Sequence, residues 1–428
     1  MSRLVFLLAA VFYVTAAPAL GAAPDPSFGG GGLVRTFEAP DGSGTQLKGA
    51  TDVAVQPDGR IVVAADVVGP LGERDWVVVR YLPDGRLDPG FGRGGATVVE
   101  TGTEGVARAL ALQPDGKILV TGPATCDWEQ CFAALRLNPD GSRDAGFGEG
   151  GLARHAPVRR TDAYDVAVQP DGRIVLAGRW FQGGDANDDD LACVMRLLPD
   201  GRLDPGFSRD GMVRLDHGYG DDFLQAIAIQ GRRIVVAGAG RLIGDRGGFA
   251  VVRFRPDGSL DRTFGRRGRR IVSFGSRRWA TPLAVSTAPG GRLVIAGNTG
   301  RVAHRWQPAV ARLTRAGSLD RGFGSGGRVH TRVPPFGGGA LAMQVDAGGR
   351  VLLAGDAYAD TTRDAADWAL VRHTRSGRLD RSFAPGGVLR GGFSGSANGA
   401  SALAIAGDRL VAAGTISSML GVARYVLP

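Results

Sequence analysis

Lysine is almost absent from this chain, since Lys48 and Lys117 are the only two and 49 of the 51 basic residues are arginines. The formal net charge of +9 is therefore carried by guanidinium groups. The arginines are spread along the whole chain and recur partly at fixed positions of a repeat, which is not the dedicated basic patch typical of nucleic-acid-binding proteins. We therefore expect no nucleic-acid partner.

Cysteine is also scarce, with three residues in the chain. Cys126 and Cys131 are close enough in sequence to close a small loop as a disulfide in an oxidising compartment. Cys193 lies in an apolar strand, where we expect a buried free thiol. A metal site would need a second pair of ligands near the first two cysteines, and the sequence has none there.

The five histidines show no catalytic or metal-binding spacing, since no His-x-His or His-Glu-x-x-His pattern joins any of them. No nucleophile elbow and no phosphate-binding glycine loop is present either. We therefore predict no catalytic residue, no metal and no cofactor, and do not expect an enzyme. The acidic run from Asp185 to Asp190 is the best calcium candidate, but it lacks the Asp-x-Asp-x-Asp-Gly order, and we interpret it as a solvated loop.

Long hydrophobic runs are missing, so the sequence predicts no transmembrane segment in the mature protein. The apolar run from Leu4 to Val14 follows Arg3 and precedes small residues that end near Ala22. This order is typical of a secretory signal peptide. We expect residues 1–22 to be the signal peptide and residues 23–428 to be one domain of a secreted or periplasmic protein, which we expect to be a monomer.

Glycine, in contrast, is abundant, with 69 residues, and indicates an all-β chain with many tight turns. An Asp-x-x-Phe element recurs seven times, about sixty residues apart, with its phenylalanines at Phe28, Phe91, Phe147, Phe207, Phe264, Phe323 and Phe383. Residues 53–64 show the local pattern best, because a Pro-Asp-Gly turn there joins two apolar strands into a hairpin. A third strand, a second turn and a fourth strand follow in each repeat.

Seven four-stranded antiparallel repeats that cannot bury both faces alone can stack radially, which predicts a seven-bladed β-propeller. A straight β-solenoid is the alternative, although its coils are usually shorter and parallel. The last repeat stops before its corner and fourth strand. Residues 25–37 supply that missing piece at the other end of the chain, so we expect the N-terminal strand to complete the last blade and close the ring.

Segments such as residues 77–92, which combine a Val-Val-Val-Arg-Tyr strand, a Pro-Asp-Gly turn and an Asp-Pro-Gly-Phe-Gly corner, resemble the delta-60 repeat family of bacterial proteins. The resemblance covers nearly all of residues 23–428. It implies an exported or surface-associated repeat protein, and carries over no activity or ligand.

An arginine in each third strand precedes the corner aspartate by eight residues, and the last arginine has its aspartate at the other end of the chain. We expect structural ion pairs at each corner because a guanidinium and a carboxylate form strong bidentate contacts. The expected pairs are Arg80–Asp88, Arg136–Asp144, Arg196–Asp204, Arg253–Asp261, Arg312–Asp320, Arg372–Asp380 and Arg424–Asp25.

The turns between the first and second strands and between the third and fourth strands have nearly the same sequence in each blade, and they should share one rim of the propeller. The connections between the second and third strands and between one blade and the next vary from blade to blade, and they should share the opposite rim. Loops held by a rigid scaffold often carry binding residues, and aromatic and arginine side chains favour partner contacts. The candidate ligand-binding residues on this rim are Trp180, Tyr219, Arg246, Arg277, Trp279, His304, Trp306 and Tyr358.

Three functions remain open at this point. The leading hypothesis is an exported, non-catalytic binding module for an envelope, glycan or protein partner. The alternatives are a structural envelope-surface protein without a small ligand, and an enzyme such as a lyase or dehydrogenase built on a propeller. An enzyme would require acid, base and cation groups from non-equivalent repeats in the central channel.

Overall fold

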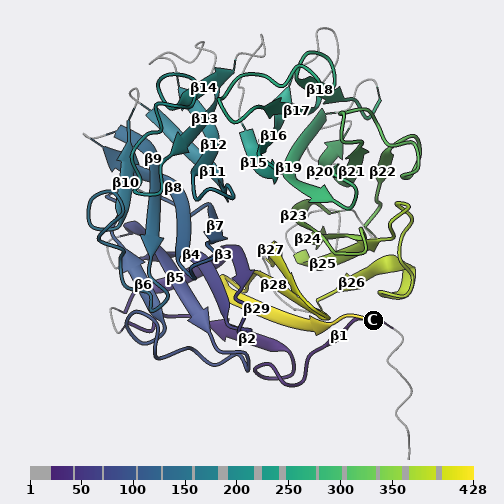
Figure 1. Ribbon diagram of the computed structural model, residues 1–428. Coiled ribbons are helices and arrows are strands. Elements are labelled where there is room, and N and C mark those ends of the chain that lie inside the picture. Colours follow the sequence, from purple (N-terminus) through teal and green to yellow (C-terminus); the bar gives the residue numbers. More distant parts are fainter. Residues whose placement is uncertain are drawn as a thin grey trace, which may run out of the picture.

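A computed structural model describes residues 21–41, 44–69, 72–102, 105–126, 129–156, 160–181, 191–215, 224–240, 247–275, 279–300, 306–333, 338–358, 366–391 and 398–428. The proposed signal peptide lies outside these residues except for its last two. The described chain forms seven antiparallel sheets arranged around one axis (Figure 1), which confirms the predicted seven-bladed propeller.

Each of the first six blades takes four consecutive strands in sequence order. Blade one contains β3 (Gln46–Val55), β4 (Ile61–Val68), β5 (Arg74–Tyr81) and β6 (Ala96–Val99), and blade two contains β7 (Ala109–Leu112), β8 (Ile118–Cys126), β9 (Glu129–Leu137) and β10 (Leu152–His155). Blade three contains β11 (Arg160–Val168), β12 (Ile174–Phe181), β13 (Leu191–Leu197) and β14 (Met212–Leu215).

The next three blades repeat this order. Blade four contains β15 (Leu224–Gln230), β16 (Arg233–Gly240), β17 (Gly248–Phe254) and β18 (Arg269–Val272). Blade five contains β19 (Trp279–Ala288), β20 (Arg292–Gly300), β21 (Gln307–Leu313) and β22 (Arg328–His330). Blade six contains β23 (Ala340–Val345), β24 (Val351–Tyr358), β25 (Ala366–His373) and β26 (Val388–Arg390), with a short 3₁₀ turn η1 (Pro385–Gly387) before its last strand.

Blade seven joins the two ends of the described chain. Its inner strands are β27 (Gly399–Ala406), β28 (Arg409–Ile416) and β29 (Met419–Val426), and its outer edge is formed by β1 (Ala23–Pro24) and β2 (Leu33–Thr36). Both N-terminal strands pair antiparallel with β29, with Ala23 opposite Val426 and Leu33 opposite Ala423. The purple and yellow ends of the ribbon therefore lie in one sheet (Figure 1), as the ring-closure prediction requires.

The hydrophobic core is divided among the seven interfaces between neighbouring blades. One cluster, for example, combines Val411 and Val422 of blade seven with Ile61 and Val79 of blade one. All seven corner phenylalanines are fully buried. The first strand of each blade lies nearest the axis and packs against the first strand of the next blade. This stacking buries the apolar faces that a single four-stranded sheet would expose.

Glycine is required where a corner meets the next blade. Gly85 has a φ of +90°, and a Cβ built on it would lie 2.9 Å from the backbone nitrogen of Gly29. Neither the backbone conformation nor the space allows a side chain there. The Pro-Asp-Gly turn of one blade can therefore lie directly against the corner of its neighbour.

Candidate functional site

Each corner contains a buried or largely buried ion pair at the spacing that the sequence indicates. Nε of the third-strand arginine lies 2.6–2.9 Å from Oδ2 of the corner aspartate in all seven blades. The guanidinium also lies over the ring of the corner phenylalanine, at 4.5 Å in the case of Arg80 and Phe91. Because burial desolvates both groups, removing one partner of such a pair costs more than removing one partner of an exposed ion pair.

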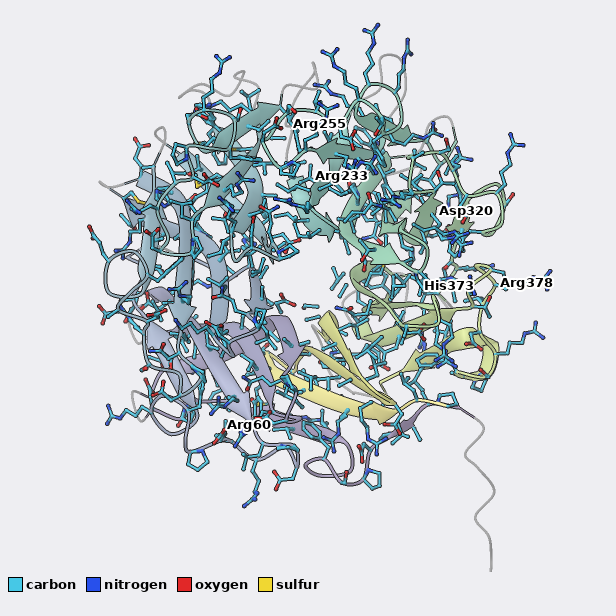
Figure 2. All side chains as sticks on the ribbon, viewed as in Figure 1. Arg60, Arg233, Arg255, Asp320, His373 and Arg378 are labelled. Carbon is cyan, nitrogen blue, oxygen red and sulfur yellow. A yellow bond between two sulfur atoms is a disulfide. The ribbon has the colours of Figure 1, made fainter. Side chains whose placement is uncertain are left out.

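Six of the corner aspartates bind a second cation that sequence reasoning missed. The residue is the arginine or lysine that follows the first turn of the blade, as in Arg60, whose Nε lies 3.0 Å from Oδ2 of Asp88. Lys117, Arg173, Arg233, Arg292 and Arg409 have the same role in other blades. Figure 2 labels Arg60, Arg233 and Asp320 among these groups. The recurrence of a basic residue directly after the first turn of these blades was the sequence signal that could have predicted this second cation.

The corner arginines also join neighbouring blades. Nη1 of Arg253 in blade four donates to the carbonyl oxygen of Arg315 in blade five at 2.6 Å. The corresponding bonds of Arg80, Arg136, Arg196, Arg312 and Arg424 each reach a turn carbonyl of the next blade. We call this set of contacts, comprising the arginine, its aspartate, its phenylalanine and the neighbouring carbonyl, the corner clamp. Arg372 lacks the last contact, and its Nη1 is buried without a hydrogen-bond partner in the structure.

The corner clamp keeps its carboxylates ionised. Burial raises the pKa of Asp261, but hydrogen bonds from Thr263 and the charges of Arg253 and Arg233 outweigh it and lower the pKa to about 2. The pKa of Asp88, Asp144, Asp204, Asp320, Asp380 and Asp25 is lowered in the same direction by equivalent contacts. These aspartates are therefore acceptors in a scaffold, and they do not act as proton donors near neutral pH.

Four of the eight candidate rim residues fall within the described chain. Trp279 begins β19 opposite Gly300, and its side chain is 38% exposed. Trp306 directly precedes β21, whose first residue lies opposite Thr299, so both tryptophans are at the same end of blade five. Tyr358 ends β24 and is half-buried. Tyr219, Arg246, Arg277 and His304 lie outside the described residues, as do Asp185 to Asp190.

Trp180 has a different environment from Trp279. It is half-buried against the core shared by blades two and three, and the guanidinium of Arg214 lies 4.3 Å from its ring centroid. This packing gives Trp180 a structural role at the hairpin of β12 and β13. Trp279 is therefore better placed than Trp180 to contact a partner from this rim.

Two aspartates on first strands lie near the axis. Asp52 of blade one accepts hydrogen bonds from the backbone of Val53 at 2.8 Å and of Leu110 in blade two at 2.7 Å. Asp165 of blade three makes the same contacts to Val166 and to Ile227 of blade four. Burial raises the pKa of Asp52 to about 6, and burial together with the charge of Asp52 raises the pKa of Asp165 to about 7.

The cysteines lie in two different blades. Cys126 and Cys131 form a disulfide that bridges β8 and β9. Cys193 is a fully buried free thiol in β13. Among the described residues no group of three or more histidine, cysteine or acidic side chains could hold a metal ion, and no helix there is long and apolar enough to cross a membrane.

Several solved structures are similar to this chain at low sequence identity. Raptor from Chaetomium thermophilum matches with a TM-score of 0.54 and 10% identity, covering 93% of this chain and 29% of that one. A protein of unknown function from Dyadobacter fermentans matches with a TM-score of 0.48 and 14% identity, covering 95% of this chain and 100% of that one. The polysaccharide lyase Uly1 matches with a TM-score of 0.47 and 11% identity, covering 89% of this chain and 90% of that one. The likeness to Raptor, at 10% identity, shows the fold alone, and this chain spans less than a third of the Raptor chain.

No curated protein matches the sequence. A family model does match, described as a domain of unknown function (DUF5122) beta-propeller, at residues 56–91, 113–147, 169–207, 232–264 and 289–323. Each matched segment ends at a corner phenylalanine, so the model covers the strands and turns that form the corner clamps of blades one to five. Five of the seven repeats therefore match the DUF5122 β-propeller family, in agreement with the resemblance to delta-60 repeats.

Proposed function

We propose that this protein is an exported, non-catalytic binding module whose propeller presents one rim to a component of the cell envelope. The component is polar, and either anionic or glycan-like. The protein acts as a monomer in the periplasm or outside the cell. The observation that carries the proposal is the contrast between the two rims, since one has the same arginine–aspartate pair at each corner and the other has side chains that differ from blade to blade.

The two rims use their polar residues differently. On the rim of the corner clamps, arginines and aspartates pair within each corner, and the arginines also bind turn carbonyls of the next blade. On the opposite rim, blade five presents Trp279 and Trp306 at one end of its sheet, and blade six presents Tyr358. Aromatic side chains at the ends of rigid strands supply contact area at little entropic cost, which suits binding of a sugar ring or peptide.

The proposal is tested by screening the mature protein against glycans and cell-envelope fractions and then comparing two variants. Trp279→Ala combined with Trp306→Ala is expected to abolish the binding found. Leu379→Ala is the matched control, because Leu379 is 39% exposed, close to the 38% of Trp279, and lies at a corner on the other rim. Binding lost in the control and kept in the tryptophan variant would place the ligand on the clamp rim.

Absence of any ligand in the screen would instead favour a structural role at the cell surface. Export is tested separately by cell fractionation and by sequencing the N-terminus of the mature protein. We expect that terminus near Ala22 or Ala23. A cytoplasmic protein that retains Met1 would contradict the signal-peptide prediction.

A further inference from the structure

The arginines are not evenly distributed along the chain. Residues 262–319 contain twelve arginines and no acidic residue, whereas the remainder of the chain holds 39 basic and 42 acidic residues. This segment runs from the corner of blade four through most of blade five. The expectation of positive charge spread along the whole chain is therefore wrong for this side of the propeller.

Within this segment, Arg292 and Arg312 share the carboxylate of Asp320. The other arginines that the structure describes there form no ion pair with any described residue; they are Arg262, Arg266, Arg267, Arg269, Arg270 and Arg315. Arg328 of β22 likewise has no acidic partner in the described part of the chain. Unpaired guanidinium groups therefore accumulate around the outer strands of blades four and five.

Two of these arginines face each other across the interface of blades four and five. Arg270 lies two residues before Val272, which is buried in the core shared with blade five. Arg328 lies two residues before His330, whose ring centroid is 5.2 Å from that of Phe274 in blade four. Residues two apart in a strand point to the same face. Both arginines therefore point into the same interblade groove.

The other six interfaces have a different composition at this register. At each of these interfaces, the two residues that occupy the positions of Arg270 and Arg328 include at least one aliphatic side chain. Most of these residues are packed into the core between the two blades. The equivalent pairs are Val34–Ala96, Thr97–Leu152, Ala153–Met212, Val213–Arg269, Val329–Val388 and Leu389–Leu33. Only the interface of blades four and five places two cations opposite each other among these described pairs.

The arrangement is electrostatically unfavourable without a counter-charge. Nε of Arg270 and Nε of Arg328 are both buried and have no hydrogen-bond partner in the structure. Burial and the neighbouring charge of Arg270 lower the pKa of Arg328. Buried donors without acceptors and like charges in proximity both cost folding free energy. An acceptor with negative charge would relieve both costs together.

A cavity of about 670 Å³ opens beside Arg328 on the outer wall of the propeller. Ser273, Phe274, Ser325 and His330 line it together with Arg328, and Arg270 lies outside its lining. Hydroxyl, imidazole and guanidinium groups are donors suited to an oxyanion. A single carboxylate would neutralise one of the two guanidinium groups, whereas a tetrahedral dianion can neutralise both.

We propose that the groove between β18 and β22 is a binding site for a sulfate or phosphate group, held by Arg270 and Arg328. The site lies on the outer wall and does not depend on the rim proposed above. The same group can be a free anion or a substituent of an acidic polymer. Free sulfate and phosphate can bring two negative charges, whereas a sulfate ester or a phosphodiester brings one, so a polymer would supply the second charge from a neighbouring group.

The test is a titration of the mature protein with sodium sulfate and sodium phosphate at constant ionic strength, followed by calorimetry and thermal melting. Sodium acetate serves as the monoanion. We expect saturable binding of sulfate or phosphate with a rise in Tm, and no saturable binding of acetate. Absence of saturable sulfate and phosphate binding, or acetate binding of equal affinity, would overturn the proposal.

Two double variants with the same loss of charge separate this site from general attraction. Arg270→Gln with Arg328→Gln should weaken binding by at least about tenfold, because each lost guanidinium removes a charge-assisted hydrogen bond. Arg266→Gln with Arg267→Gln alters exposed corner residues of the same blade and should leave binding within about twofold, because exposed charges are screened. Equal weakening in both variants would show that net charge, and not the groove, binds the anion.

Folding of the groove variant is checked by its melting curve without anion. Removing two facing cations should not lower the Tm. The conservative variant Arg270→Lys with Arg328→Lys provides a second readout, because it keeps the charge and loses the planar set of N–H donors. We expect it to bind sulfate more weakly than the wild type. Unchanged affinity in the lysine variant would contradict the assigned geometry.

The source of the group is distinguished with polymers. Dextran sulfate and double-stranded DNA both carry tetrahedral oxyanion groups, and uncharged dextran carries none. If the groove acts on a polymer, one of the charged polymers should compete with inorganic sulfate and lose its affinity in the glutamine variant of the groove. Competition by uncharged dextran would contradict an anion site.

Discussion

The corner clamp of blade seven, which joins the two ends of the chain, should stabilise the protein as much as the clamp of a blade formed by consecutive strands. Arg424 and Arg136 occupy equivalent positions, but Arg424 binds Asp25 across a sequence separation of 399 residues and Arg136 binds Asp144 across eight. Changing each to methionine keeps an apolar stem of similar length and removes the guanidinium. The two variants therefore lose the same kind of contacts, in one case where the two ends of the chain meet and in the other where they do not.

The contacts that each variant loses are nearly identical. Arg424 loses its bond to Asp25 at 2.9 Å, its contact with Phe28 at 4.7 Å and its bond to the Pro83 carbonyl. Arg136 loses the equivalent contacts to Asp144, Phe147 and Pro199. Each aspartate keeps one other cation. Breaking a buried ion pair costs about 3–5 kcal/mol, and the remaining cation should reduce this to about 2–4 kcal/mol for each variant.

Chemical denaturation followed by tryptophan fluorescence measures both costs, with the midpoint and the slope compared among variants. Arg86→Met is the control, because Arg86 forms an ion pair with Asp84 at 2.7 Å but its side chain is 77% exposed. We expect the control to keep the wild-type midpoint. If Arg136→Met is strongly destabilised and Arg424→Met is unchanged, the N-terminal strand does not close the ring in solution.

Three further predictions follow from other parts of the propeller. A chain that starts after Phe37 lacks β1, β2 and Asp25, so it should lose cooperative melting, whereas removal of residues 1–21 should leave the melting curve unchanged. Thiol titration of unfolded, non-reduced protein from an oxidising compartment should give one thiol, from Cys193, and reduction should cost about 2 kcal/mol or less because the disulfide closes a short loop; three thiols before reduction would rule the disulfide out. Asp52 and Asp165 have folded pKa values of about 6 and about 7, above the ordinary value of 3.8, so their ionisation disfavours the folded state and their contribution to stability falls as pH rises through these values. The melting temperature of the wild type minus that of the double variant Asp52→Asn, Asp165→Asn should therefore decrease between about pH 5 and pH 8. An increase in this difference would contradict the direction of the pKa shifts.

The candidate binding rim was only partly accessible to sequence reasoning. Trp180 and Trp279 both border variable connections, and nothing in the local sequence separates them. In the structure Arg214, from strand β14 of the same blade, covers the ring of Trp180, while Trp279 remains 38% exposed. Exposure of a side chain depends on what packs beside it from other strands, and a sequence pattern does not contain that information.

The amino-acid sequence by itself determined the seven blades, the order of strands within each blade and the arginine–aspartate spacing at the corners. These features are local, because turn residues and strand alternation act over a few neighbours, and sevenfold repetition makes the signal strong. The pairing of Arg424 with Asp25 also followed, since one corner lacked its partner downstream.

Only the tertiary structure decided which side chains meet across blades. The bond from Arg253 to the Arg315 carbonyl, the second cation on Asp88, and the opposition of Arg270 and Arg328 all join residues from different strands or blades. Such contacts depend on the angle and distance at which two twisted sheets stack. The repeat period shows that neighbouring blades stack, whereas the residues that face each other in the groove are set by the register of each outer strand.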